Sequence, residues 1–260
     1  MPIPSGRLLT AAVLVPLLAG LIWRLPPVAF AVWVAAVILG VQYEFYRLFF
    51  REGWMIWPGL IGGGFLLFCV HQNRPLLGVA LACAGVLMAT LFSYRAIQTA
   101  ASDAALLVLG LVYPTGLLAH LILIRALPEM GQQMIAFLLL VTWGGDAVAY
   151  YVGRAIGGRK LAPVVSPNKT LSGAVGGLIG SVLCALLAQQ IFHLNLPSAH
   201  LLPLALGMGG LGQVGDLVES LFKRSAGVKD SGGLIPAHGG LFDKLDSIAF
   251  AAPVLYVYLR

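Results

Sequence analysis

The chain has 260 residues, of which 59% are hydrophobic and 10% are charged. Soluble domains carry roughly 25% charged residues, so this composition excludes an ordinary soluble protein. The formal net charge is +6, which a membrane topology explains without any need for nucleic-acid binding.

Nine apolar stretches are long enough, or nearly long enough, to cross a bilayer, which takes about 17–25 helical residues. The fold expected is therefore all-α, a polytopic bundle of about nine transmembrane helices. The stretches cover residues 8–23, 27–42, 55–71, 75–93, 104–124, 132–151, 173–192, 200–217 and 247–259.

Lysine and arginine residues flank these nine stretches unevenly. Twelve fall on the side of the N-terminus and four on the other side. Because cytoplasmic loops are enriched in lysine and arginine, we expect the N-terminus in the cytoplasm and the C-terminus on the opposite side. The basic excess of the chain then follows from its topology.

The two halves of the chain differ in character. Residues 1–130 carry polar residues mainly at the ends of apolar stretches, as at 44–47, and we expect them to form scaffold helices. Asp146 lies inside the sixth stretch, where a carboxylate costs a few kcal/mol unless it faces a polar cavity or a partner. Asp146 is therefore a candidate site residue, with a purely structural contact as the alternative. We expect residues 131–260 to hold the functional site within one continuous membrane domain.

A basic loop follows the sixth stretch and ends in Ser166, Pro167, Asn168, Lys169 and Thr170. A serine before a proline is typical of a helix N-cap with proline in the first turn. Free backbone amides at a helix start, together with a lysine, can cradle a phosphate. Basic cytoplasmic loops occur in most membrane proteins, so this stretch does not define a site by itself.

The segment 215–246 concentrates charge in an otherwise apolar chain, since it holds five of the ten acidic residues. Two pairs of these residues are spaced three apart, so each pair shares one face of a helix. Carboxylates from two helices form a hard oxygen site that suits Mg²⁺, which also takes water and substrate phosphates as ligands. We expect such a site, with a second cation left open, from Asp216, Glu219, Asp243 and Asp246.

Four basic residues and one histidine lie in the same segment. Their number indicates an anionic ligand as well as internal ion pairs. The turn formed by His238, Gly239 and Gly240 can present backbone amides and an imidazole to a phosphate. A salt-bridged pair of cytoplasmic helices is the alternative interpretation, and spacing alone does not decide between the two.

The order of residues in this segment closely resembles the signature of the phosphatidate cytidylyltransferases, or CDP-diacylglycerol synthases. The resemblance rests on S-x2-K-R-x4-K-D-x-G-x2-I-P-x-H-G-G-x2-D-x2-D, which runs from Ser220 to Asp246. It extends upstream to 215–219, 146–153 and 166–173, whereas the first half of the chain agrees only in being membrane-spanning. The chain departs from the family pattern at four positions. The family usually has Trp in place of Leu171, Glu or Gln in place of Ser172, Gly in place of Ala237, and Arg in place of Lys244.

The resemblance implies an enzyme that transfers the cytidylyl group of CTP to phosphatidic acid, giving CDP-diacylglycerol and pyrophosphate at the cytoplasmic face of a bacterial inner membrane. Its implied partners are CTP, phosphatidic acid and the bilayer, with Mg²⁺ as cofactor and a homodimer left open. Catalytic roles are implied for Lys223, Arg224, Lys229, Asp230, His238 and Lys244. Substrate-binding roles are implied for Asp146, Tyr150, Ser166, Asn168, Lys169, Thr170, Ser220, Gly239 and Gly240.

Three alternatives stay open. A related CTP-dependent enzyme could act on another lipid phosphate or a polyprenol. A transporter could line an anion path with these charges, but transporters usually show paired broken helices in two related halves. Within the nine expected stretches, charged residues occur only in the second half of the chain. The departures at Leu171 and Ser172 leave open a catalytically idle scaffold.

Overall fold

A computed structural model describes residues 16–50, 53–93, 96–232 and 239–260 of the chain. These residues form two compact units. The first draws on residues 1–123 and 230–243, and the second on residues 124–229 and 244–260. Part of the charged segment therefore belongs with the N-terminal helices.

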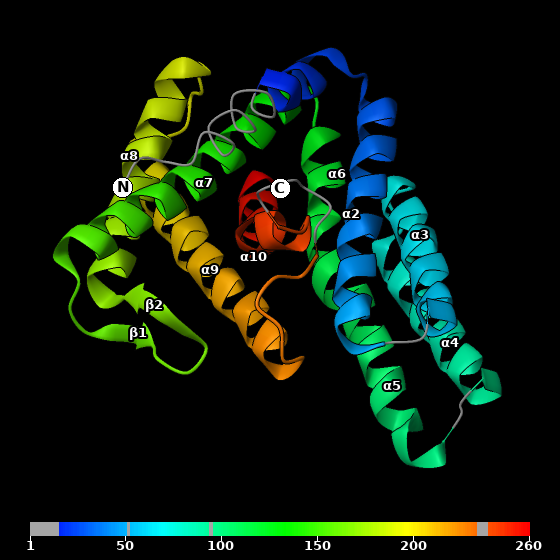
Figure 1. Cartoon of the computed structure of the whole chain (residues 1–260). Coiled ribbons are helices and arrows are strands. Elements are labelled where there is room, and N and C mark those ends of the chain that lie inside the picture. Colours follow the sequence, from blue (N-terminus) through cyan, green and yellow to red (C-terminus); the bar gives the residue numbers. More distant parts are fainter. Residues whose placement is uncertain (1–15, 51–52, 94–95, 233–238) are drawn as a thin grey trace. The chain divides into compact units, whose positions relative to one another are not determined.

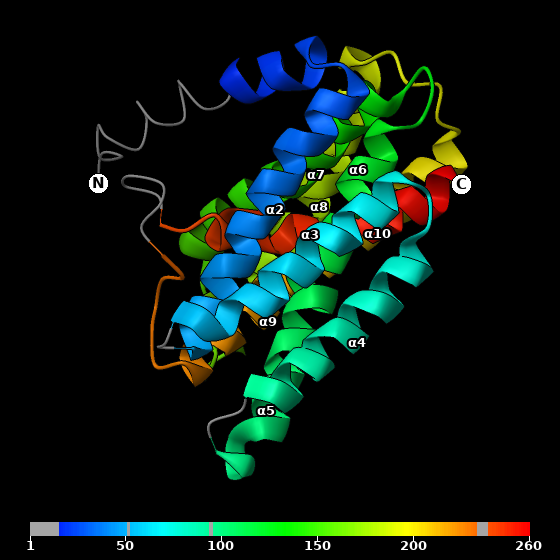
Figure 2. The same ribbon diagram turned by 90° about the vertical axis from the view of Figure 1, so that its right-hand side faces the viewer.

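The first unit is built from helices (Figure 1). Residues 16–24 are helical, and α3 packs along α4 (Figure 2). The run from α5 to α6 is interrupted by a π-helical turn, η2, that contains Pro114. Proline lacks the N–H that an α-helix needs, and a π turn accommodates that loss. The elements are α2 Pro27–Phe49, the 3₁₀ turn η1 Gly53–Ile56, α3 Trp57–His71, α4 Pro75–Ser93, α5 Ile97–Gly110, η2 Leu111–Gly116 and α6 His120–Arg125, whose last two residues belong to the second unit.

Tyr46 on α2 is fully buried and lies against α3 and α5. Its hydroxyl donates a hydrogen bond to the carbonyl of Leu107 at 2.6 Å and accepts one from Gln42 at 3.0 Å. Gly59 and Gly110 lie against its ring so closely that a Cβ at either position would clash with it. Small residues at helix crossings let a large polar side chain be packed and hydrogen-bonded inside an apolar bundle.

The second unit consists of four helices and one short hairpin. A turn and the hairpin connect α7 to α8 (Figure 1), and α8 packs on both α7 and α9. The two strands are antiparallel, with Lys160 opposite Thr170 and Ala162 opposite Ser166. The elements are α7 Gly131–Ile156, β1 Lys160–Ala162, β2 Ser166–Thr170, α8 Leu171–Ile191, α9 Ser198–Ser225 and α10 Phe242–Leu259, whose first two residues belong to the first unit.

The predicted helix N-cap at Ser166 is wrong. Ser166 begins β2, and α8 begins at Leu171 with Thr170 as its N-cap. The Thr170 hydroxyl accepts a hydrogen bond from the N–H of Gly173 at 3.1 Å. Pro167 is compatible with a strand at the edge of a two-stranded sheet, so the Ser-Pro pair does not require a helix start.

Seven helical stretches in the described part of the chain are long and apolar enough to cross a membrane. They correspond to the second to eighth of the nine expected spans, which confirms the expected all-α, polytopic membrane protein. Half of the first expected span, residues 8–15, lies outside the described residues. The ninth corresponds to α10, which is not among the seven and carries Asp243, Lys244 and Asp246 near its start. The count of nine and the division at residue 130 stay predictions.

Candidate functional site

Helices α9 and α10 approach each other closely at Gly215. A Cβ built on Gly215 would lie 2.5 Å from the carbonyl oxygen of Asp246, and one built on Gly212 would lie 3.5 Å from the carbonyl oxygen of Ser247. A Cβ contact of 2.5 Å is shorter than van der Waals packing allows, so only glycine fits at residue 215 without moving α10. This close packing brings Asp216 on α9 next to Asp246 on α10.

Three carboxylates meet at this helix pair. One oxygen each from Asp216, Glu219 and Asp246 lies within 4.8 Å of the others, and the latter two side chains are buried. Like charges this close repel one another, and burial adds a desolvation cost, so cations around the cluster stabilise it. Asp216 and Glu219 converge because they are three residues apart on one helix face, as their spacing predicts.

Two lysines supply part of that positive charge. The ammonium of Lys169, on β2, lies 2.5 Å from Oδ2 of Asp216. The ammonium of Lys223, one turn along α9, lies 2.6 Å from Oε2 of Glu219. Three carboxylates and two ammonium groups leave one negative charge, and the hard oxygen donors come from two helices. This donor set fits a divalent cation such as Mg²⁺.

Within the second unit, two hydrogen bonds connect α7 to Lys244 and Ser247 of α10. The Ser247 hydroxyl donates to Oδ2 of Asp146 at 2.9 Å, and the Trp143 indole N–H donates to the carbonyl of Lys244 at 3.3 Å. The N–H of Ser247 also donates to Oδ1 of Asp246 at 2.8 Å. Asp146 thus has a polar partner within the bundle, as an intramembrane carboxylate requires.

A polar pocket of about 580 Å³ opens beside the carboxylate cluster, between α7, the hairpin, α8 and α9. Arg154 and Lys160 add basic groups to its lining, and the Arg154 guanidinium donates to the Tyr150 hydroxyl at 3.2 Å. Six of the residues with expected roles line this pocket: Asp146, Tyr150, Asn168, Lys169, Thr170 and Asp216. The pocket therefore brings together six of the nineteen residues with expected roles, and those roles stay predictions.

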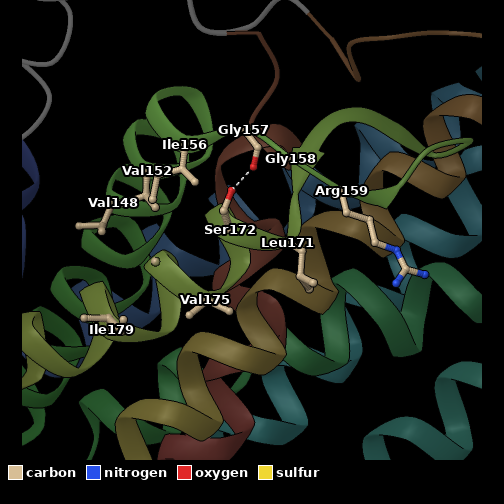
Figure 3. A pocket seen from close by; sticks show the side chains of 11 residues that line it. Val148, Val152, Ile156, Gly157, Gly158, Arg159, Leu171, Ser172, Val175 and Ile179 are labelled. Carbon is tan, nitrogen blue, oxygen red and sulfur yellow. Dashed lines mark hydrogen bonds between the residues drawn. The ribbon is translucent and has the colours of Figure 1, made fainter.

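An apolar groove of about 630 Å³ adjoins the polar pocket along α7 and α8 (Figure 3). Gly157 and Gly158 line both cavities. The Ser172 hydroxyl donates to the carbonyl of Gly157 at 2.5 Å, so it ties the start of α8 to this shared rim. The remaining lining is mostly aliphatic: Val148, Val152, Ile156, Leu171, Val175 and Ile179, with Arg159 and Gly176.

Several expected site residues have other surroundings. The Arg224 guanidinium donates to the backbone carbonyls of Val165 at 3.3 Å and Val228 at 3.2 Å, which links the end of α9 to the hairpin turn. Lys229 and Asp230 are exposed, and Ser220 is buried on α9. Their expected roles stay predictions.

In the first unit, Asp243 accepts hydrogen bonds through Oδ2 from Gly240 N at 2.8 Å and from the Ser231 hydroxyl at 3.1 Å. Gly239 has a φ of +86°, which favours glycine. His238 and Ala237 lie outside the described residues, and the roles expected of His238 and Asp243 stay predictions.

Sequence reasoning missed Glu44, which it grouped with the polar ends of the scaffold spans. Glu44 lies on α2 with 3% of its surface exposed. Its Oε2 accepts hydrogen bonds from the N–H of Phe242 at 2.8 Å and from the Ser231 hydroxyl at 3.2 Å. A carboxylate among apolar membrane residues is itself a signal of a functional contact.

The apolar helices indicate an integral membrane protein, and Asp216, Glu219 and Asp246 have the geometry of a metal-ion site. The chain matches the cytidylyltransferase family over residues 5–260, and it belongs to that family. The family resemblance and enzyme class expected from the motifs are thereby confirmed.

Three relatives illustrate the match. The phosphatidate cytidylyltransferase of Brucella abortus (strain 2308) is 37% identical over 258 residues, which are 97% of this chain and 92% of that protein. That of Bacillus subtilis (strain 168) is 43% identical over 140 residues, 54% of this chain and 52% of the relative. That of Staphylococcus saprophyticus is 46% identical over 129 residues, half of each chain. The last two alignments thus span about half the length of those relatives.

Proposed function

We propose that this chain transfers the cytidylyl group of CTP to phosphatidic acid, giving CDP-diacylglycerol and pyrophosphate for phospholipid synthesis. One observation carries the proposal: Asp216, Glu219 and Asp246 cluster with Lys169 and Lys223 beside a polar pocket that adjoins an apolar groove. The names of the relatives favour the same reaction.

In this reaction a phosphate oxygen of the lipid attacks the α-phosphorus of CTP, and the bond between that phosphorus and the bridging oxygen to the β-phosphate breaks. Both reactants are anions, so the protein has to position them and offset their charge. The lipid phosphate is already ionised at neutral pH, so the residues need not remove a proton from it.

The residues of the cluster have two expected roles, metal binding and phosphate binding. Asp216, Glu219 and Asp246 would hold Mg²⁺, which when bound neutralises phosphate oxygens and the pyrophosphate leaving group. Lys169 would bind the triphosphate in the polar pocket, and Lys223 would offset phosphate charge. The catalytic roles near the phosphates extend to Arg224, Lys229, Asp230, His238 and Lys244. Asp243 is a further candidate metal ligand, and a second cation remains part of the proposal.

The apolar groove suits the acyl chains of the lipid. Its lining is mostly aliphatic, and it meets the polar pocket at Gly157 and Gly158. A lipid lying in the groove could place its phosphate at this rim, next to the basic Arg159. The substrate class that fits both cavities is a phosphorylated lipid together with a nucleotide.

We further propose that the enzyme lies in a bacterial inner membrane with its site at the cytoplasmic face, its N-terminus in the cytoplasm and its C-terminus opposite. The excess of basic residues on the N-terminal side supports this orientation. Cysteine labelling from either side of sealed vesicles tests it, and light scattering of the purified protein tests a homodimer.

The proposed function is tested with purified protein in lipid vesicles, Mg²⁺, CTP labelled at the α-phosphate, and a panel of lipid phosphates. We expect label in the lipid product only with phosphatidic acid, together with stoichiometric pyrophosphate. Label in a polyprenyl or ether-lipid product instead would identify a related enzyme, and anion flux without CTP cleavage would identify a transporter.

A further inference from the structure

Glu44 connects α2 to the segment between α9 and α10, within the first unit. Its carboxylate is buried and accepts one backbone and one hydroxyl hydrogen bond through Oε2. Its other oxygen, Oε1, has no hydrogen-bond partner among the described residues. A buried carboxylate with so few partners is costly, so its presence here requires an explanation other than packing.

The hydrogen bond from Phe242 caps the N-terminus of α10 with a residue that is distant in the sequence. Phe242 is the first residue of α10, and its N–H is one of the four that a helix start leaves without an intrahelical acceptor. Glu44 accepts this bond from a position 198 residues earlier in the chain. A negative charge at a helix N-terminus also interacts favourably with the helix dipole.

The hydrogen bond to Ser231 connects Glu44 to the charged segment 215–246 as well. The Ser231 hydroxyl lies 3.2 Å from Oε2 of Glu44 and 3.1 Å from Oδ2 of Asp243. A hydroxyl has one proton and can donate to one of the two carboxylates at a time. Glu44 and Asp243 are therefore held around one shared group, and a change in either alters the other's partner.

Close packing fixes Glu44 in this place. A Cβ on Gly232 would lie 2.7 Å from Oε1 of Glu44, and a Cβ on Gly240 would clash with Oε2. The ring of Phe242 packs edge-on against Phe45 and Tyr113, with centroids 5.9 Å and 5.8 Å apart. Ser231, Gly232, Gly240 and Phe242 therefore lie directly against Glu44 of α2, and the two glycines leave room for its carboxylate.

We propose that Glu44 is a positioning residue for cytidylyl transfer. It fixes Ser231 and the first residue of α10, and so sets where this helix, which carries Asp243 and Asp246, begins. The inference rests on the proposed function, but the geometric part of it can be measured without turnover.

The geometric part is tested by hydrogen–deuterium exchange of the full-length protein in vesicles. We compare wild type with Glu44→Ala, which removes the acceptor, Glu44→Gln, which keeps a carbonyl acceptor, and Glu129→Gln, in which an exposed glutamate is changed. We expect Glu44→Ala to speed exchange in peptides covering 239–246 by about tenfold, as loss of about 1.4 kcal/mol of local protection predicts. Glu44→Gln and Glu129→Gln are expected to stay near wild type. Equal exchange in Glu44→Ala and wild type would overturn the inference.

The catalytic part is tested on the folded fraction of the same proteins. Glu44→Ala is expected to lower kcat about tenfold or more and to change KM for CTP less than about threefold, because Glu44 does not line the polar pocket. Glu44→Gln is expected to recover at least about a third of kcat. A Glu44→Ala protein that unfolds more readily but keeps wild-type kcat when folded would show a merely structural role.

The two proposals fail in different ways. If the wild-type protein forms no CDP-lipid while Glu44→Ala still speeds exchange at 239–246, the proposed function is rejected but the positioning contact is not. If instead the wild-type protein is active, and Glu44→Ala changes neither turnover nor exchange, only this inference is rejected.

Discussion

The ammonium group of Lys169 lies 2.5 Å from Oδ2 of Asp216, and this ion pair connects the β-hairpin to the acidic face of α9. The two side chains are 27% and 31% exposed, so the pair adds at most about 1 kcal/mol to the free energy of unfolding. Under the proposed function the pair matters for ligand binding. We expect an incoming phosphate to replace Asp216 as the partner of Lys169, and a cation to bind Asp216.

The first prediction concerns that lysine. Lys169→Gln is expected to raise KM for CTP by about tenfold or more, because one charge-assisted phosphate contact is worth about 1.5–3 kcal/mol. The free energy of unfolding should change by less than about 1 kcal/mol. Initial rates over a CTP series and thermal unfolding in detergent measure the two quantities. Arg74→Gln, in an exposed connection of the first unit, is the control, and an unchanged KM in Lys169→Gln would contradict the prediction.

The second prediction concerns the buried carboxylate of α10. Asp246→Asn is expected to lower turnover by more than about 100-fold, since loss of an outer-shell partner alone costs metal sites about 10–100-fold. The variant should stay folded, because it relieves repulsion among three close carboxylates. Turnover at increasing Mg²⁺ and a melting curve check both points. Near-normal turnover would remove Asp246 from the proposed metal site.

The third prediction concerns Lys244, where the family usually has arginine. Lys244→Arg is expected to leave kcat unchanged or to raise it, because arginine keeps the charge and adds a bidentate grip on phosphate. Lys244→Ala should lower it. The check is to measure kcat of wild type, Lys244→Arg and Lys244→Ala at the same lipid and CTP concentrations. A large loss of kcat in Lys244→Arg would mean that the site requires the lysine ammonium group.

The fourth prediction concerns the apolar groove. Val175→Trp, which fills it, is expected to raise KM for long-chain phosphatidic acid several-fold and to affect a short-chain analogue much less. Leu187→Trp, at an exposed position of the same helix outside the groove, is the control. Equal effects of Val175→Trp on the long-chain and short-chain lipids would mean that the chains bind elsewhere.

The sequence predicted those features that depend on local patterns. Apolar length predicted seven of the membrane helices, and the three-residue spacing of Asp216 and Glu219 predicted their convergence. The hairpin was missed because the Ser-Pro pair at 166–167 is compatible with both a helix start and an edge strand. No local pattern relates Glu44 to Ser231, which lies 187 residues later, so their contact depends on tertiary packing.

The rim formed by Gly157 and Gly158 has a consequence for how the enzyme obtains its lipid. Pulling an acyl chain into water costs about 0.8 kcal/mol per CH₂ group, a prohibitive sum for two long chains. Because the groove and the polar pocket share this rim, we expect the lipid phosphate to bind at the rim while both tails remain in their leaflet. The enzyme then meets its lipid substrate by diffusion within the bilayer. The rate should therefore depend on the mole fraction of substrate in the bilayer and not on its bulk concentration. Diluting the substrate with inert phospholipid at constant total amount would slow the enzyme, whereas adding more buffer would not.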